Sequence, residues 1–127
     1  MTVAVAHSDS EHGKVALRAA AAEAVLHEET LAVLHIVPAV ADPHSEGPSL
    51  EEHLRDELTD FPDLTVALHT AAEGPSTAGA LVDLATEIDA SLLVIGSRRR
   101  SAVGKLLLGS TVQRVLLDAP MPVLVVK

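Results

Sequence analysis

Short apolar segments alternate along the chain with segments of helical periodicity, and this alternation constrains the fold more than any other feature. Apolar runs bounded by turn residues predict buried strands, and apolar side chains three or four residues apart predict amphipathic helices. The expected strands cover residues 3–7, 31–37, 64–70, 91–95 and 122–126. The expected helices begin near Ser8, Ser49, Pro75 and Ser110. Apolar strands separated by helices predict an α/β fold, a doubly wound parallel sheet with helices on both faces.

The first expected helix is rich in alanine and begins at a recognisable signal. Ser8 and Glu11 have the spacing of a capping box, in which a serine caps the helix and a glutamate follows three residues later. The helix is predicted to face the core through a stripe of apolar residues at helical spacing, formed by Val15, Ala19, Ala22 and Leu26.

Composition bounds the class of protein. A length of 127 residues predicts a single domain, residues 1–127, and 48% hydrophobic residues suffice for one core. Phe61 is the only aromatic residue and the net charge is −9, which argues against nucleic acid as a partner. No apolar run reaches the roughly 20 residues that span a bilayer. With no cysteine and no signal peptide at the first strand, we expect a cytoplasmic protein without membrane contact.

A cationic segment near the end of this acidic chain predicts an anion site. The fourth expected strand ends at Gly96, Arg98, Arg99 and Arg100 follow, and Gly109-Ser110 opens the last helix. Helix N-termini attract anions, and ligands bind such sheets at the carboxyl ends of the strands. Two interpretations stay open: Ser110 donates its hydroxyl to a phosphate, or it only caps the helix beside a solvated loop. The segment is neither a Walker A loop nor a dinucleotide fingerprint.

The histidines predict no metal site, because none has metal-ligand spacing and no cysteine is present. His7, His35 and His69 fall near the ends of the first three strands, where we interpret them as a polar rim of the same crevice.

The end of the chain resembles the universal stress protein family. The segments that carry the resemblance are Val94-Ile95-Gly96-Ser97, Gly109-Ser110-Thr111-Val112 and residues 119–126, with Leu34-His35-Ile36-Val37 in support. The resemblance covers essentially the whole chain. It implies an adenine nucleotide alpha hydrolase-like fold with a five-stranded parallel sheet in the order 3-2-1-4-5.

ATP-binding members of that family carry a glycine, two residues, a glycine, nine residues, a glycine and then Ser or Thr. Gly96, Gly109 and Ser110 match this pattern, whereas Arg99 stands in place of the middle glycine. These members also tend to carry an aspartate after the first strand, where this chain has Ser8. A guanidinium offers a fork of donors to phosphate, so Arg99, with Arg98 and Arg100, is expected to replace backbone contacts by side-chain contacts.

The resemblance therefore implies a stress-response regulator that binds ATP or another nucleotide, with Mg²⁺. We expect the adenine and ribose near Ala6, Ser8 and Val37. The phosphates are expected near Gly96, Arg99, Gly109, Ser110 and Thr111, and Ile95 is expected among the nucleotide-binding residues. Hydrolysis is expected to be slow at most, because no general base or metal-binding acid is evident near the phosphates; Asp9 is the nearest candidate and a weak one.

The last strand, 122–126, is apolar and is expected at a sheet edge, where an unpaired strand is a template for association. In the resembled family this strand pairs with its copy across a two-fold axis, so a homodimer is expected. The alternative function is a nucleotide-independent dimeric scaffold that acts through protein partners, with the arginine loop docking an acidic one.

Overall fold

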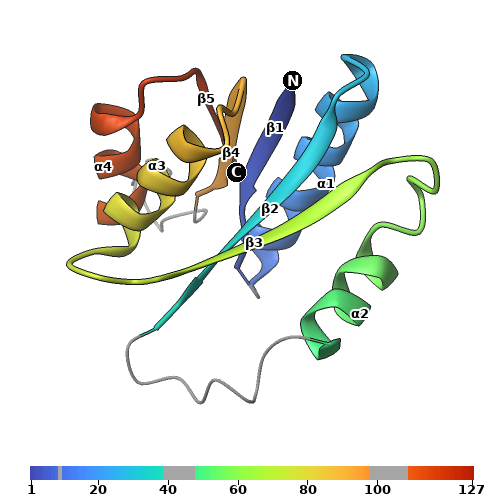
Figure 1. Ribbon diagram of the computed structural model, residues 1–127, viewed down its shortest axis with the longest axis horizontal. Helices are drawn as coiled ribbons and strands as arrows, with labels where there is room; N and C mark the ends of the chain where they lie inside the picture. The colour runs from blue at the N-terminus through green and yellow to red at the C-terminus, as the bar shows by residue number, and fades with distance from the viewer. Residues whose placement is uncertain (9, 39–47, 98–108) are drawn as a thin grey trace, which may run out of the picture.

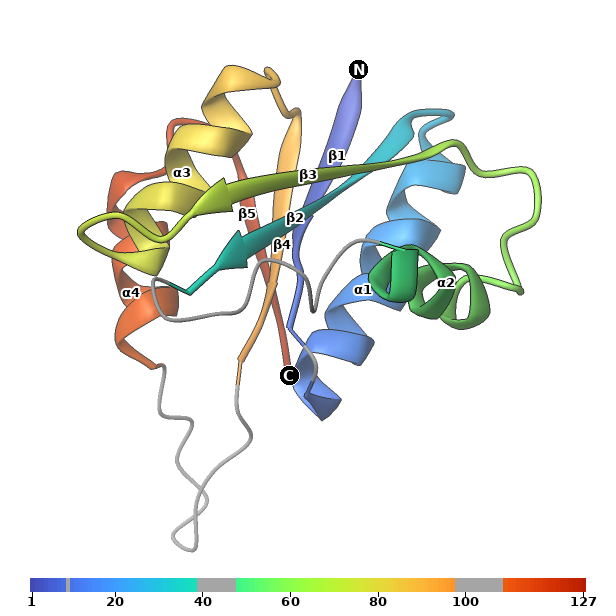
Figure 2. The same ribbon diagram turned by 60° about the horizontal axis from the view of Figure 1, so that its bottom comes forward.

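The computed structural model describes residues 1–8, 10–38, 48–97 and 109–127, which form one parallel sheet between two layers of helices (Figures 1 and 2). The strands are β1 (Thr2–Ala6), β2 (Thr30–Val37), β3 (Val66–Ala72), β4 (Leu92–Gly96) and β5 (Val123–Val126). The helices are α1 (Glu11–Leu26), α2 (Pro48–Glu57), α3 (Thr77–Glu87) and α4 (Ser110–Asp118). No helix of this described part is long and apolar enough to cross a bilayer.

The sheet has the order β3-β2-β1-β4-β5 with every pair parallel, which confirms the predicted fold class. The strands alternate between two hydrophobic cores. Val3 and Val5 of β1 face α1 and α2, whereas Ala4 and Ala6 face α3 and α4. Figure 2 shows these helix pairs on opposite sides of the sheet. Because β1 is the central strand of the sheet, its carboxyl end lies at the middle of one end of the sheet rather than at a side edge.

Strand β3 begins two residues later than predicted because a turn occupies the expected start. The Leu64 amide donates to the Phe61 carbonyl, and the sheet begins where the Leu31 amide donates to the Thr65 carbonyl. The strand also ends two residues later than predicted, at Ala72, and Glu73 follows it.

Helix α1 starts and faces the core differently from the prediction. Ser10, not Ser8, is the N-cap, and its side chain accepts a hydrogen bond from the Gly13 amide. The buried face consists of Gly13, Ala16, Leu17, Ala20, Ala21 and Ala24. The predicted stripe was wrong, because Val15 and Leu26 are exposed. Alanines on every side of the helix left its periodicity ambiguous, and close packing on the sheet selected the face with the smallest side chains.

Because α1 has a buried face and an exposed face, the same Leu→Ala substitution should lower the free energy of unfolding by different amounts on the two faces. Leu17 is 3% exposed and Leu26 is 72% exposed. Leu17→Ala should lower the free energy of unfolding by roughly 2 to 5 kcal/mol, because it leaves a cavity in the core. Leu26→Ala, the matched control, should change it by no more than about 0.5 kcal/mol. Urea denaturation measures the free energy of unfolding of both variants. Equal losses in the two variants would contradict the observed orientation of α1.

Candidate functional site

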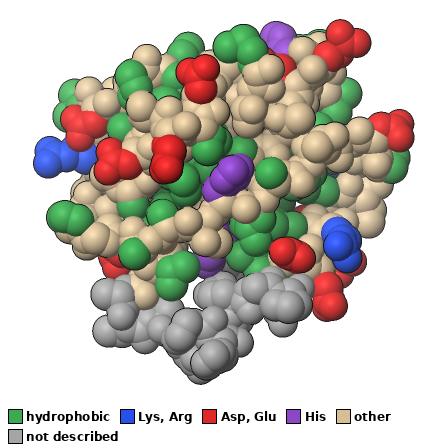
Figure 3. Space-filling view, viewed as in Figure 1, with side chains coloured by type: hydrophobic (Ala, Val, Ile, Leu, Met, Phe, Trp, Pro, Cys, Tyr) green, Lys and Arg blue, Asp and Glu red, His purple; other side chains and the backbone are tan. Residues whose placement is uncertain are grey.

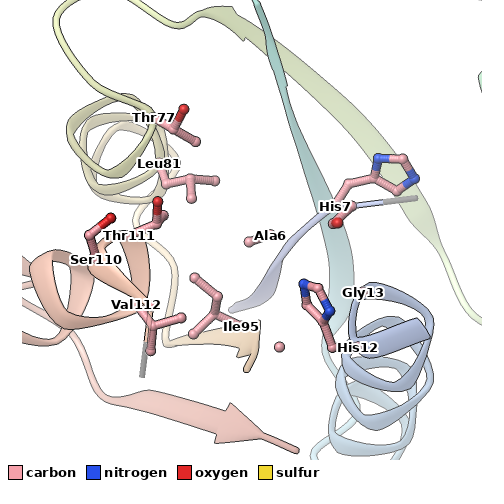
Figure 4. A pocket seen from close by; sticks show the side chains of 13 residues that line it. Ala6, His7, His12, Gly13, Thr77, Leu81, Ile95, Ser110, Thr111 and Val112 are labelled. Atoms are coloured by element: carbon pink, nitrogen blue, oxygen red, sulfur yellow. The ribbon is translucent and has the colours of Figure 1, made fainter. Parts of the chain in front are cut away.

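A pocket of about 700 Å³ opens where β1 and β4 end and α1, α3 and α4 begin (Figure 4). Parallel strands bring their carboxyl ends, and the amino ends of the following helices, to the same side of the sheet. The described residues that line the pocket are Ala6, His7, Ser8, His12, Gly13, Thr77, Leu81, Ile95, Gly96, Gly109, Ser110, Thr111 and Val112. A volume of this size is typical of small-molecule sites, which span roughly 300 to 1,000 Å³.

The pocket has an apolar floor and a polar wall. Ala6, Leu81, Ile95 and Val112 form the floor, and all four belong to the buried core under α3 and α4. Hydroxyl groups stand around this floor, contributed by Ser8, Thr77, Ser110 and Thr111. An apolar floor with a few convergent polar groups suits a ligand that has one flat apolar part and one polar part.

The electrostatics of the pocket favour a negative ligand. The chain has 18 acidic residues, and acidic side chains are spread over the face seen in Figure 3. None of the described lining residues is acidic, however. The first turns of α1, α3 and α4 contribute His12, Thr77 and Ser110 to the lining, so the positive ends of three helix dipoles meet there.

Helix α4 presents its first turn to the pocket without a side-chain cap. Gly109 is the N-cap residue, with φ −67° and ψ 163°, and within the described part of the chain no side-chain hydrogen bond caps the helix. Ser110 is the first helical residue and not the N-cap, so the interpretation in which Ser110 only caps the helix was wrong. The uncapped turn leaves backbone N–H donors for an anion, as helix N-termini do in phosphate sites.

Three glycines line the pocket for different reasons. A Cβ at Gly96 would overlap the carbonyl oxygen of His12, and one at Gly13 would overlap that of Ser8. Both glycines therefore allow the start of α1 to lie against the ends of β1 and β4. At Gly109 no described atom lies within 4 Å of the position a Cβ would take, and φ has an ordinary negative value. The described residues thus give no packing reason for a glycine at 109, and a residue without a Cβ there would allow a ligand to approach the backbone closely.

The wall at the end of β1 is a network of short polar contacts. Ser8 Oγ lies 2.8 Å from Ser10 Oγ, which lies 3.2 Å from Nδ1 and 3.1 Å from Nε2 of His12. His7 and His35 are neighbours at the ends of β1 and β2. Their Nδ1 atoms are 3.2 Å apart and their rings meet edge to face. Within the described residues, no group of three His, Asp or Glu side chains is placed to hold a metal ion.

The structure brings most of the predicted site residues together. Ala6, Ser8, Ile95, Gly96, Gly109, Ser110 and Thr111 all line this one pocket. Val37 is half-buried at the end of β2 and is not among the lining residues. Arg98, Arg99 and Arg100 lie outside the described residues, as does Asp9.

Sequence reasoning missed the lining residues that come from first helical turns, His12, Gly13 and Thr77. It also missed Leu81 and Val112, which form part of the floor. His7 was placed at the rim of the crevice but was not among the predicted binding residues. The sequence did carry a signal for His12 and Thr77. Both stand in the first turn of a helix that follows a strand, and such turns face the carboxyl end of the sheet.

Comparisons with known proteins place the chain among named relatives. The model of the universal stress protein family matches residues 1–127. A universal stress protein of Thermus aquaticus, from the region 3′ of a QAH/OAS sulfhydrylase, is 34% identical over 135 residues, covering 99% of this chain and 98% of its own. One from Mycolicibacterium smegmatis is 45% identical over 85 residues, covering 61% of this chain and only 55% of that relative. The structure of an Archaeoglobus fulgidus universal stress protein in complex with dAMP has a TM-score of 0.80 and 26% identity, covering 100% of this chain and 98% of its own.

The different roles of two lining glycines predict different effects on stability. Gly96→Ala should lower the free energy of unfolding by roughly 1 to 3 kcal/mol, because the new methyl group pushes α1 away from β4. Gly109→Ala should cost less than about 1 kcal/mol, because the methyl group enters open space at the helix start. Thermal unfolding of the two variants tests this. A Gly109→Ala variant at least as unstable as Gly96→Ala would show that Gly109 is structural.

Proposed function

Because this chain belongs to the universal stress protein family over its whole length, we propose that it binds an adenine nucleotide in the pocket at the carboxyl ends of β1 and β4. One observation carries the proposal: the uncapped start of α4 at Gly109 faces a pocket whose described lining contains no carboxylate. The dAMP complex of the Archaeoglobus fulgidus relative, which shares the fold over the full length, supports the same ligand class.

The phosphates are proposed to lie against the first turn of α4. The Ser110 and Thr111 hydroxyls and the uncapped backbone amides offer donors there, and Gly109 lets a phosphate oxygen approach the backbone. The Arg98, Arg99 and Arg100 contribution remains a prediction from the sequence.

The adenine and ribose are proposed to lie over the apolar floor of Ala6, Leu81, Ile95 and Val112, with the Ser8 hydroxyl beside them. A planar base covers apolar surface efficiently, and each buried apolar Å² contributes about 25 cal/mol. Val37 remains a predicted neighbour of the base, one strand away from β1.

We propose ATP with Mg²⁺ as the ligand and a regulatory rather than a catalytic role. Mg²⁺ prefers oxygen ligands, and it is commonly held by one or two carboxylates together with substrate phosphates. The described lining offers no carboxylate for a metal ion or for activating water, so Mg²⁺ would be held mainly by the nucleotide. Any hydrolysis should therefore be slow.

Calorimetric titration with ATP–Mg²⁺, AMP and inorganic phosphate tests the proposal. We expect micromolar affinity for ATP and no binding of phosphate alone at the same concentration. Gly109→Ala should weaken ATP binding at least tenfold, because a methyl group holds the phosphate away from the first turn of α4. Absence of heat with every nucleotide would contradict the proposal and favour the nucleotide-independent scaffold that acts through protein partners.

We also propose a homodimer through β5. This strand lies at one edge of the sheet, contains only apolar residues, and exposes Leu124 by 36%. An apolar edge strand of this kind is a template for pairing with a second copy. Leu116 and Leu117 of α4 add further exposed apolar surface near this edge.

Leu124→Lys should convert the dimer to a monomer, because a charge on the edge strand disfavours pairing. Val66→Lys is the matched control, since Val66 lies on the opposite edge strand and is 38% exposed. Sedimentation velocity measures the oligomeric state of the wild type and of both variants. A wild-type monomer, or dissociation caused equally by Val66→Lys, would contradict association through β5.

A further inference from the structure

We propose that the His12 imidazole is a phosphate-binding group on the α1 side of the pocket, and that it makes nucleotide affinity depend on pH. The inference rests on the proposed function and adds a regulation of the same site. His12 lines the pocket from the first turn of α1, across from Ser110 and Thr111 on α4 (Figure 4). An anion seated at the start of α4 would then lie between a helix N-terminus and an imidazole.

The position of His12 is fixed by backbone packing. Its carbonyl oxygen occupies the space that a side chain at residue 96 would need, so α1 lies in direct contact with the end of β4. The N-cap bond from the Gly13 amide to Ser10 Oγ holds the same turn from the other side. The ring is therefore carried by a rigid turn, which suits a group that positions a ligand.

The His12 ring also keeps bonding capacity for a ligand. Among the described residues its partner is Ser10 Oγ, 3.2 Å from Nδ1 and 3.1 Å from Nε2. One oxygen almost equidistant from both nitrogens cannot lie along the bonding direction of both. At least one nitrogen therefore has its bonding direction clear of Ser10 Oγ. In a protonated ring both nitrogens are donors, so this nitrogen would donate to a bound phosphate and the ring would add a positive charge to the pocket.

The described charges around His12 are few. His7 from β1 shares a nitrogen contact with His35 of β2, and on α1 Glu11 and Lys14 carry opposite charges. The lining residues from β4, α3 and α4 are uncharged, but the Glu73 carboxylate outside the lining accepts a hydrogen bond from the Thr77 hydroxyl at 3.2 Å. Without a described carboxylate in the lining, a bound phosphate becomes the natural counterion of a protonated ring. Because protonation of an imidazole adds a positive charge, acidification should tighten nucleotide binding.

The test compares ATP–Mg²⁺ affinities of the wild type, His12→Gln and His12→Lys at pH 6 and pH 8, measured by calorimetry. Because the variants are compared at the same pH, the ionisation of the ATP phosphates is the same for all of them and drops out of the comparison. The wild type should bind about tenfold more tightly than His12→Gln at pH 6 and only slightly more tightly at pH 8. His12→Lys should keep wild-type affinity at pH 6 and exceed it at pH 8, because its charge persists. Adenosine, which has no phosphate, should bind all three proteins equally.

His27→Gln is the matched control, since His27 is exposed at the opposite end of α1 and lies 3.2 Å from Glu23. It should follow the wild type at both pH values. Equal ATP affinity of the wild type and His12→Gln at both pH values would overturn this inference while leaving the proposed function intact. Absence of nucleotide binding by the wild type would overturn both. Circular dichroism melts confirm that the variants are folded.

Discussion

The close packing of the first turn of α1 against the ends of β1 and β4 is the constraint on which the pocket depends. It requires glycine at positions 13 and 96, because a side chain at either would overlap backbone atoms of Ser8 or His12. The contact seats the start of α1 beside the carboxyl ends of the two central strands. The parallel topology places the starts of α3 and α4 at the same end of the sheet, and the pocket lies between these three turns.

This arrangement explains how an acidic protein can offer a site for a negative ligand. The described lining of the pocket contains no carboxylate, although the Glu73 carboxylate accepts a hydrogen bond from the lining residue Thr77, and the positive ends of three helices converge on the pocket. Long-range repulsion from a net charge of −9 is screened by salt beyond about 8 to 10 Å, whereas the amides and hydroxyls of the lining act at contact distance. The groups that line the pocket therefore decide which sign of charge the ligand carries.

Strand identity was predictable because each strand is a short run set between turn signals, whereas the sheet order was implied by the resemblance to the universal stress protein family. The orientation of α1 was not, since an alanine-rich helix presents small apolar residues on several faces and only packing on the sheet selects one. The cap was placed at Ser8 rather than Ser10 because both serines stand before the helix and the sequence does not show which one meets the Gly13 amide.

For the site, residues adjacent to strand ends were predicted and most of them share one pocket. Lining residues within helical turns, such as His12 and Thr77, depend on how the helices pack and were missed. The contribution of Arg98, Arg99 and Arg100 falls outside the described residues.

Amide chemical-shift mapping by NMR during titration with AMP shows whether a nucleotide binds in this pocket. We expect the amides of Gly109, Ser110 and Thr111 to shift together with those of Ser8 and His12 and to saturate at a single dissociation constant. Shifts confined to another surface, such as the groove between α2 and β3 lined by Leu54, Phe61 and Leu68, would contradict binding in this pocket.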